Sequence, residues 1–360
     1  MESSPRTPEA PAPGAAARLG AWATVLLIGI LALNTAGGWV RLSGSGVAIP
    51  HWPLIELADG KRTLLPPFSA RDWQAAYEAW QAHQQRLAQR VAAGELPALA
   101  RGRQPADLDE FRAMFLIEWF HRLLAALVGL LALSCLGTAL VQRALRARVG
   151  SWFAAALILI GVQAWLGAAL IAEGTGTRWL FLHQGNAALI AGCVLLAILR
   201  LVDQRHELRA LPLFAAALAW LLLVSGGLLA GSRHLAPPAG PLGLDAGPLW
   251  WPTATLAANL LDNGALHHLV HRLAALLLIA AILAAWWQAA RQQAAERVRL
   301  ALAAAATFAV VEAMLGLASA TLPRGAIIVP LAHQFLGHVL FLTLLIAACA
   351  PRPAAADAGA

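Results

Sequence analysis

Residues 114–141 read MFLIEWFHRLLAALVGLLALSCLGTALV, and this stretch decides the fold class. A helix needs about 20 apolar residues to cross the hydrocarbon core of a membrane, and the stretch is longer than that. Glu118, His121 and Arg122 lie near its start. Because ionisable residues inside a membrane are costly, the stretch predicts a functional site as well as a spanning helix.

Seven other stretches are long and apolar enough to span a membrane, and each is bounded by Arg, Pro or Gly. They are residues 20–40, 151–172, 179–199, 212–231, 267–287, 300–321 and 330–349. No extended strand pattern competes with them, and only helices and closed barrels span lipid. The sequence therefore predicts an all-α integral membrane protein with eight transmembrane helices.

The composition excludes the main soluble classes. Of the 360 residues, 59% are hydrophobic and only 12% are charged, whereas a soluble domain carries about 25% charged residues. The formal charge is +7, but every basic residue except Lys61 is an arginine, and the arginines lie between apolar runs. That placement indicates membrane topology rather than nucleic-acid binding. The three cysteines lie inside apolar runs and fit no zinc spacing.

Arginines in the short loops predict the orientation. Nine of them follow the second, fourth and sixth spans, and three lie in short loops on the other side. The nine are Arg143, Arg146, Arg148, Arg200, Arg205, Arg209, Arg291, Arg297 and Arg299, and the three are Arg178, Arg233 and Arg324. The arginine-rich side is cytoplasmic, so both termini are predicted to be cytoplasmic. Long loops translocate regardless of charge. Segment 41–112 is therefore placed on the outer face, with an amphipathic helix near Asp72–Val91.

Sequence elements repeat at a nearly constant offset of 149 or 150 residues. The shared elements are His-Arg-Leu at 121–123 and 271–273, His-Gln at 183–184 and 333–334, and Val-x-Ala-x-Leu-Gly at 162–167 and 311–316. Their agreement predicts two tandem four-helix bundles. Because each half has an even number of helices, the repeat is predicted to be parallel, with a pseudo-twofold axis along the membrane normal.

The repeat and the spans divide the chain into five segments. We predict a cytoplasmic tail at 1–19, an N-terminal bundle at 20–200 that includes the outer loop 41–112, a cytoplasmic linker at 201–211, a C-terminal bundle at 212–350 and a tail at 351–360.

One histidine recurs in each even-numbered span, near its outer end: His121, His183, His271 and His333. The two histidines of each half can face each other, and two facing imidazoles are the usual axial arrangement for a haem iron. Zinc would usually need a third or fourth ligand, and no cysteine or carboxylate recurs beside both pairs. The alternative is that these histidines only hydrogen-bond neighbouring helices. The remaining histidines are weaker candidates: His51, His83, His206, His234, His267, His268 and His338.

The two halves differ beside their first histidine. Glu118 lies three residues before His121 and shares its helix face, whereas His268 holds that position before His271. A carboxylate there can hydrogen-bond the ring or act as a base on a bound substrate. We expect no carboxylate near His271 and His333. This difference predicts that the first half performs chemistry and the second holds a fixed cofactor.

An arginine follows the first histidine of each half. Arg122 and Arg272 suit haem propionates, because a guanidinium binds a carboxylate bidentately. The alternatives are an ion pair between Arg122 and Glu118, and snorkelling of either arginine to the lipid headgroups.

Further motifs surround these residues. They are Arg41-Leu42-Ser43-Gly44-Ser45-Gly46-Val47, His51-Trp52-Pro53-Leu54, Asp109-Glu110-Phe111-Arg112-Ala113-Met114-Phe115 before Glu118-Trp119-Phe120-His121-Arg122, and Asn259-Leu260-Leu261-Asp262-Asn263 before His271-Arg272. Together with the two His-Gln pairs, they resemble the haem A synthase family of proteobacteria and mitochondria. The resemblance covers all eight predicted helices. The outer-loop cysteine pair of some bacterial members is absent here, so no disulfide is carried over.

The resemblance implies an activity. Such enzymes oxidise the C8 methyl of haem O to a formyl group, by stepwise hydroxylation to a gem-diol that loses water, and so supply haem A for cytochrome oxidase. It implies that His121 and His183 hold the substrate haem O and that His271 and His333 hold a resident haem b. Glu118 would be the catalytic carboxylate, while the redox chemistry belongs to the iron.

We predict a bacterial inner-membrane location, and the arginine distribution places the histidine pairs near the periplasmic side. Candidate partners are haem O, membrane lipid, a haem O synthase, an electron donor and a second copy of the chain, with no nucleic acid. The competing interpretation is a bis-histidine dihaem membrane cytochrome acting in electron transfer or haem delivery. A carrier across the membrane would stack haems at both faces, and a transporter would show Gly/Pro pairs at mid-membrane.

Overall fold

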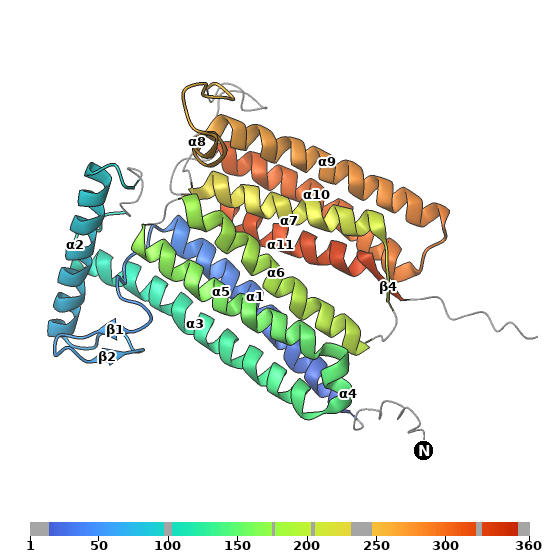
Figure 1. Cartoon of the computed structure of the whole chain (residues 1–360), viewed down its shortest axis with the longest axis horizontal. Helices are drawn as coiled ribbons and strands as arrows, with labels where there is room; N and C mark the ends of the chain where they lie inside the picture. The colour runs from blue at the N-terminus through green and yellow to red at the C-terminus, as the bar shows by residue number, and fades with distance from the viewer. Residues whose placement is uncertain are drawn as a thin grey trace, which may run out of the picture.

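The computed structural model describes six segments of the chain (Figure 1). They are residues 14–96, 103–174, 177–202, 206–231, 247–321 and 326–351. Eight helices within them are long and apolar enough to cross a membrane. They are α1 (Ala15–Leu42), α3 (Leu108–Val141), α5 (Ser151–Ala172), α6 (Thr177–Val202), α7 (Ala210–Gly231), α9 (Gly264–Arg291), α10 (Glu296–Thr321) and α11 (Ile328–Ala348). The eight predicted membrane helices are thus confirmed.

Short elements complete the fold. Four of them lie at the end of the bundle where α3 and α9 begin: β1 (Ile55–Glu56), β2 (Arg62–Thr63), α2 (Ala70–Ala92) and α8 (Leu256–Asp262). The opposite end carries α4 (Arg143–Leu145), a π-helical turn (Arg146–Gly150), β3 (His206–Leu208) and β4 (Cys349–Pro351). β1 pairs antiparallel with β2, and β3 pairs antiparallel with β4. The predicted amphipathic helix of the outer loop is confirmed as α2. The predicted linker 201–211 includes a strand, β3, that the apolar pattern did not reveal.

Several helices begin earlier than their apolar stretches. α1 begins at Ala15, inside the segment predicted as a tail. α3 begins six residues before the predicted span, because the Asp107 side chain accepts a hydrogen bond from the Glu110 backbone and caps the helix. The Asn263 side chain caps α9 in the same way, through the Leu266 backbone. Capping residues therefore set the starts of α3 and α9, whereas hydropathy marks only the part of each helix suited to lipid.

The same pattern of helix–helix contacts occurs in each half. In the first half α1 and α5 each pack against α3 and α6, and in the second half α7 and α10 each pack against α9 and α11. The halves meet where α6 packs against α7, with α11 touching α1 and α6. α6 and α11 are the two most buried of the eight helices. The symmetry axis itself stays a prediction.

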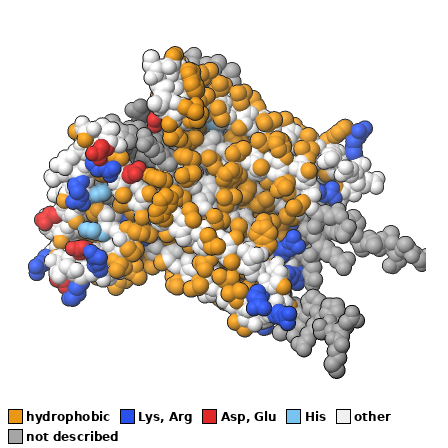
Figure 2. Space-filling model, viewed as in Figure 1, with side chains coloured by type: hydrophobic (Ala, Val, Ile, Leu, Met, Phe, Trp, Pro, Cys, Tyr) orange, Lys and Arg blue, Asp and Glu red, His pale blue; other side chains and the backbone are white. Residues whose placement is uncertain are grey.

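The outside of the bundle suits a lipid environment. Large apolar side chains lie exposed along it, as Figure 2 shows, and they include Leu130, Ile158, Leu276 and Met314. Such a continuous apolar surface is unusual for a protein in water. At the α2 end, acidic, basic and histidine side chains mix, whereas described charged groups on this face at the opposite end are basic. The membrane orientation stays a prediction.

Some residues used for the predictions cannot be placed. Arg205, Arg233, Arg324 and His234 lie outside the described residues, and so do most of the two predicted tails.

Candidate functional site

The four recurring histidines lie in the N-terminal halves of their helices: His121 in α3, His183 in α6, His271 in α9 and His333 in α11. These four helices begin at the same end of the bundle, the end covered by α2 and α8 (Figure 1). Both pairs therefore lie toward one face. That placement disagrees with an electron carrier that stacks haems at both faces of the membrane.

His271 and His333 face each other across the C-terminal half. Their ring centroids are 6.5 Å apart, with an interplanar angle of 77°. A metal bonded by two imidazoles on opposite sides, with metal–nitrogen bonds of about 2 Å, separates the ring centres by roughly 6 Å. The observed spacing therefore fits a bis-histidine iron site.

Both C-terminal rings are held through Nδ1. The Ser225 hydroxyl lies 2.7 Å from His271 Nδ1 and donates its own hydrogen to the Leu222 carbonyl, so the imidazole N–H donates to the hydroxyl. His333 Nδ1 lies 3.0 Å from Glu312 Oε2, and here too the ring N–H donates. We assign the tautomers from these partners. Nε2 of each ring is then the nitrogen left to bind a metal.

The N-terminal pair is held differently. His121 and His183 are close enough for their charges to interact. Nδ1 of each is buried and has no hydrogen-bond partner among the described residues. The Leu33 carbonyl of α1 lies near the His121 ring but makes no hydrogen bond with its Nδ1. Buried polar atoms are normally hydrogen-bonded, so these two unpaired nitrogens are exceptional. The rings of the N-terminal pair are therefore held less firmly than those of the C-terminal pair.

Each histidine ring lies against a glycine of a neighbouring helix. The pairs are Gly37 with His121, Gly167 with His183, Gly226 with His271, and Gly316 with His333. A Cβ at Gly37 or Gly316 would come within 3.0 Å of the imidazole Cε1, and one at Gly167 or Gly226 within 3.6 Å. The missing side chains leave the rings room beside the helix backbone. Paired imidazoles in glycine cradles fit an inserted haem in both halves.

Glu118 is buried and both of its oxygens are bound. Arg122 donates to Oε1 over 2.6 Å, and the Ile49 backbone donates to Oε2 over 3.0 Å. Arg122 also donates to the carbonyls of Ile49 and His51. The ion pair that the sequence left as an alternative is therefore present. Glu118 does not hydrogen-bond His121, because Arg122 and the loop after α1 engage its carboxylate instead.

The other candidates lie around the C-terminal pair or in the outer loop. Arg272 and His268 are both close enough to His271 for their charges to act on its ring. His267 lies 2.7 Å from the Leu260 carbonyl, at the junction of α8 and α9. His51 meets Arg122 through its backbone carbonyl. These contacts give His267 and His51 a local structural role.

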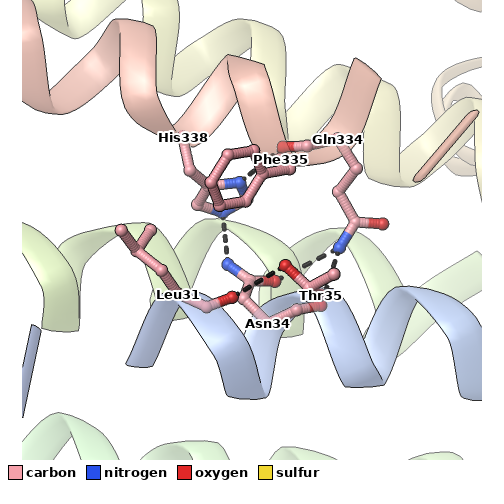
Figure 3. A pocket seen from close by; sticks show the side chains of 6 residues that line it. All are labelled: Leu31, Asn34, Thr35, Gln334, Phe335 and His338. Carbon is pink, nitrogen blue, oxygen red and sulfur yellow. Dashed lines mark hydrogen bonds between the residues drawn. The ribbon is translucent and has the colours of Figure 1, made fainter. Parts of the chain in front are cut away.

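A polar cluster joins the two halves, and we call it the junction cluster: Asn34, Gln184, Gln334 and His338. The Asn34 amide donates to His338 Nε2 over 2.6 Å, and Gln334 donates to the Asn34 carbonyl over 3.0 Å (Figure 3). His338 donates from Nδ1 to the Gln334 carbonyl. Gln184, next to His183, lies 3.5 Å from His338 Nε2. The cluster thus connects the neighbours of one histidine in each pair.

Sequence reasoning missed Glu312, and the expectation of no carboxylate near His271 and His333 was wrong. A signal was available, because Glu312 occupies the first variable position of the repeated Val-x-Ala-x-Leu-Gly element, where the first half has Gln163. Ser225 and Asn34 lie in apolar runs with no such marker. The sequence treated His338 as weak, although it is almost completely buried and hydrogen-bonded.

Comparison with known proteins places the chain among cytochrome oxidase assembly proteins. The family model described as "Cytochrome oxidase assembly protein" matches residues 20–345. Three similar curated proteins are haem A synthases. That of Rhizorhabdus wittichii is 28% identical over 94% of this chain and 95% of its own length. That of Rhodospirillum centenum is 27% identical over 90% of this chain and 85% of its own length. The Methylobacterium nodulans protein is 33% identical over 68% of each chain. Because the family model spans nearly the whole chain and these relatives share most of its length, the chain belongs to the haem A synthase family of cytochrome oxidase assembly proteins.

Proposed function

We propose that this protein is a haem A synthase, a membrane oxidoreductase that oxidises the C8 methyl of haem O to a formyl group. The observation that carries the proposal is the contrast between its two histidine pairs. One pair is fixed by hydrogen bonds at Nδ1 and has the spacing of a bis-histidine iron site. The other is buried, and neither of its Nδ1 atoms has a hydrogen-bond partner in the described part of the chain. A fixed cofactor and an exchangeable substrate require such a difference.

In this proposal His271 and His333 hold a resident haem b, and His121 and His183 hold haem O as substrate. The bound haems supply the redox chemistry, which side chains alone do not offer. The chain contributes orientation, because each imidazole packs against a glycine of a neighbouring helix. Arg272, beside His271, is the propionate partner on the C-terminal side. Arg122 can serve the other haem only through the N–H groups that it does not already donate to Glu118 and the loop.

Glu118 is the proposed catalytic carboxylate, placed one helical turn from His121. Its ion pair with Arg122 and its bond from the Ile49 amide fix where its oxygens point. A carboxylate oxygen has two lone pairs, so it can accept a further hydrogen bond from a substrate hydroxyl while it keeps these partners. Glu118 therefore holds the position of a proton acceptor beside the substrate.

The proposed location is the bacterial inner membrane, with both termini in the cytoplasm and both histidine pairs toward the periplasm. The arginine distribution of the sequence supports this orientation. A haem O synthase that delivers the substrate and an electron donor are the partners that the reaction needs.

Product analysis tests the proposal. The full-length protein is expressed in a bacterium that makes haem O but lacks its own haem A synthase, and the extracted haems are separated by chromatography. We expect haem A with its formyl spectrum, and no haem A from the His183→Ala variant. Recovery of haem O and haem b alone from cells with abundant protein would refute the synthase and favour a dihaem electron carrier or haem-delivery protein.

A further inference from the structure

We propose that Glu312 is a positioning residue that holds His333 and makes the C-terminal pair the permanent haem site. Among the residues that the structure describes, the N-terminal pair has no equivalent acceptor, so this pair exchanges its haem. This inference rests on the proposed function, in which one haem stays bound and the other is exchanged as substrate and product. It concerns how one axial ligand is held.

The local geometry is built around the Glu312 carboxylate. Oε2 accepts the hydrogen of His333 Nδ1 over 3.0 Å. One turn further along α10 is Gly316, against which the same ring packs. One turn further along α11 from His333 is Gly337, where a Cβ would come within 2.8 Å of Glu312 Oε1. Two glycines therefore make room for the ring and for the carboxylate that holds it.

The aligned residue of the first half does not hold a ring. Gln163 donates to the backbone carbonyl of His183 over 3.1 Å and accepts from the Asn186 amide over 2.7 Å. Its side chain thereby joins α5 to the α6 backbone. Nδ1 of His183 has no hydrogen bond within the described residues. The same helix position thus serves the helix backbone in one half and the imidazole in the other.

A carboxylate on the far nitrogen changes a metal-binding histidine in two ways. It fixes the ring orientation, and it makes the other nitrogen more basic. Fixed orientation slows loss of the ligand from iron. A more electron-rich imidazole, with negative charge nearby, favours ferric over ferrous iron and lowers the reduction potential. Ser225 offers His271 a neutral acceptor, so the stronger effect is on the His333 side.

The test uses purified full-length protein from cells that make haem b but no haem O, so that only the resident site fills. Wild type, Glu312→Gln, Glu312→Leu and Thr307→Val are compared for haem per chain, midpoint potential and carbon monoxide binding. Thr307 is an exposed α10 residue whose hydroxyl donates to the Ala303 carbonyl of its own helix, so Thr307→Val is the matched control. Gln keeps the size and an acceptor oxygen but removes the charge, whereas Leu removes both.

We expect Glu312→Gln to keep its haem with a raised midpoint potential. We expect Glu312→Leu to lose haem, or to bind carbon monoxide because His333 releases the iron, and Thr307→Val to match wild type. Full haem content and an unchanged potential in both Glu312 variants would overturn the inference while leaving the proposed function intact. Wild-type protein without haem would instead contradict the proposed function, and the inference with it.

Discussion

The two halves of this protein share one pattern of helix–helix contacts, yet the carboxylate near the histidine pair lies on a different helix in each half. In the first half it is Glu118 on α3, tied to Arg122 and the loop after α1. In the second half it is Glu312 on α10, tied to His333. The aligned positions hold His268 and Gln163. In the proposed function, this charged group lies beside the substrate in the first half and behind a cofactor ligand in the second.

The outer coverings of the halves differ as well. Aromatic side chains of α2 and α3 pack together over the first half, with Trp80, Phe111 and Phe115 almost completely buried. His83 of α2 lies 3.2 Å from the Ile171 carbonyl at the end of α5. The second half is covered by the short α8, whose Asn259 exchanges hydrogen bonds with the Trp251 backbone. Within the described residues, the larger cover lies over the half proposed to perform chemistry.

The largest expected effect is on membrane orientation, where the result is all or none. If the halves are related by a parallel repeat, the segments before α3 and before α9 lie on the same side. A reporter that is active only in the periplasm should work when fused after Gly94 and after Ala254, and fail after Arg205. Activity after only one of Gly94 and Ala254 would mean that the repeat is inverted.

Next in size is the effect of Glu118→Gln on turnover. Gln keeps the shape and hydrogen bonding but cannot take up a proton, and a general base contributes about 10²–10⁴-fold. Formation of haem A should fall by that order, while haem O still binds. His268→Gln changes the aligned residue of the second half and should leave turnover largely intact.

Haem extraction and expression level distinguish the two roles of Glu118. If Glu118 only anchors the loop through Arg122 and Ile49, the variant should show reduced expression or haem content with normal turnover per bound haem. Near wild-type formation of haem A would refute the catalytic role.

A smaller effect is expected from alanine in the glycine cradles. Gly316→Ala places a methyl group 3.0 Å from His333 Cε1, so the ring must move by a few tenths of an ångström. Overpacking of this kind costs about 1–3 kcal/mol, which corresponds to a loss of haem affinity of roughly fivefold to 140-fold. Gly226→Ala, beside His271, meets ordinary contact at 3.6 Å and is the matched control. Equal haem affinity in the two variants, measured by competition with a haem-binding protein, would show that the cradle is not tight.

The smallest effect concerns the cover of the first half. Burial, with a smaller contribution from Arg86, lowers the pKa of His83 below its ordinary value. His83 therefore takes up a proton less readily when α2 is packed against the bundle than when α2 is detached from it. Docking of α2 should be unaffected above about pH 6.5 and weaken as the pH falls below it. Hydrogen exchange of α2 should accelerate in acid, and His83→Gln, which keeps a donor for Ile171, should remove that pH dependence.

Much of the fold was predictable because lipid imposes a simple rule on sequence. Each spanning helix needs a long apolar run, so all eight were found, and the histidine repeat gave the pairing within each half. The helix ends were harder to predict, because Asp107 and Asn263 each act through a single capping hydrogen bond. The short helix α8 has too few residues to show a pattern.

The site was only partly predictable, for a related reason. Sequence spacing finds neighbours on one helix, and so it found Glu118 beside His121. It does not find partners on other helices, such as Glu312 for His333 or Ser225 for His271. The bonds of Glu118 to Arg122 and Ile49 illustrate the same limit, because the loop amide comes from a segment 69 residues away in sequence.

In the proposed function, the two halves hold different haems for different purposes. This assignment is tested most directly by extracting the haems of wild-type protein, His121→Ala and His271→Ala from cells that supply haem O, and quantifying each haem per chain. We expect His121→Ala to keep haem b and to yield no haem A, whereas His271→Ala should lose haem b. Loss of haem b from His121→Ala together with its retention in His271→Ala would show that the halves have the opposite roles.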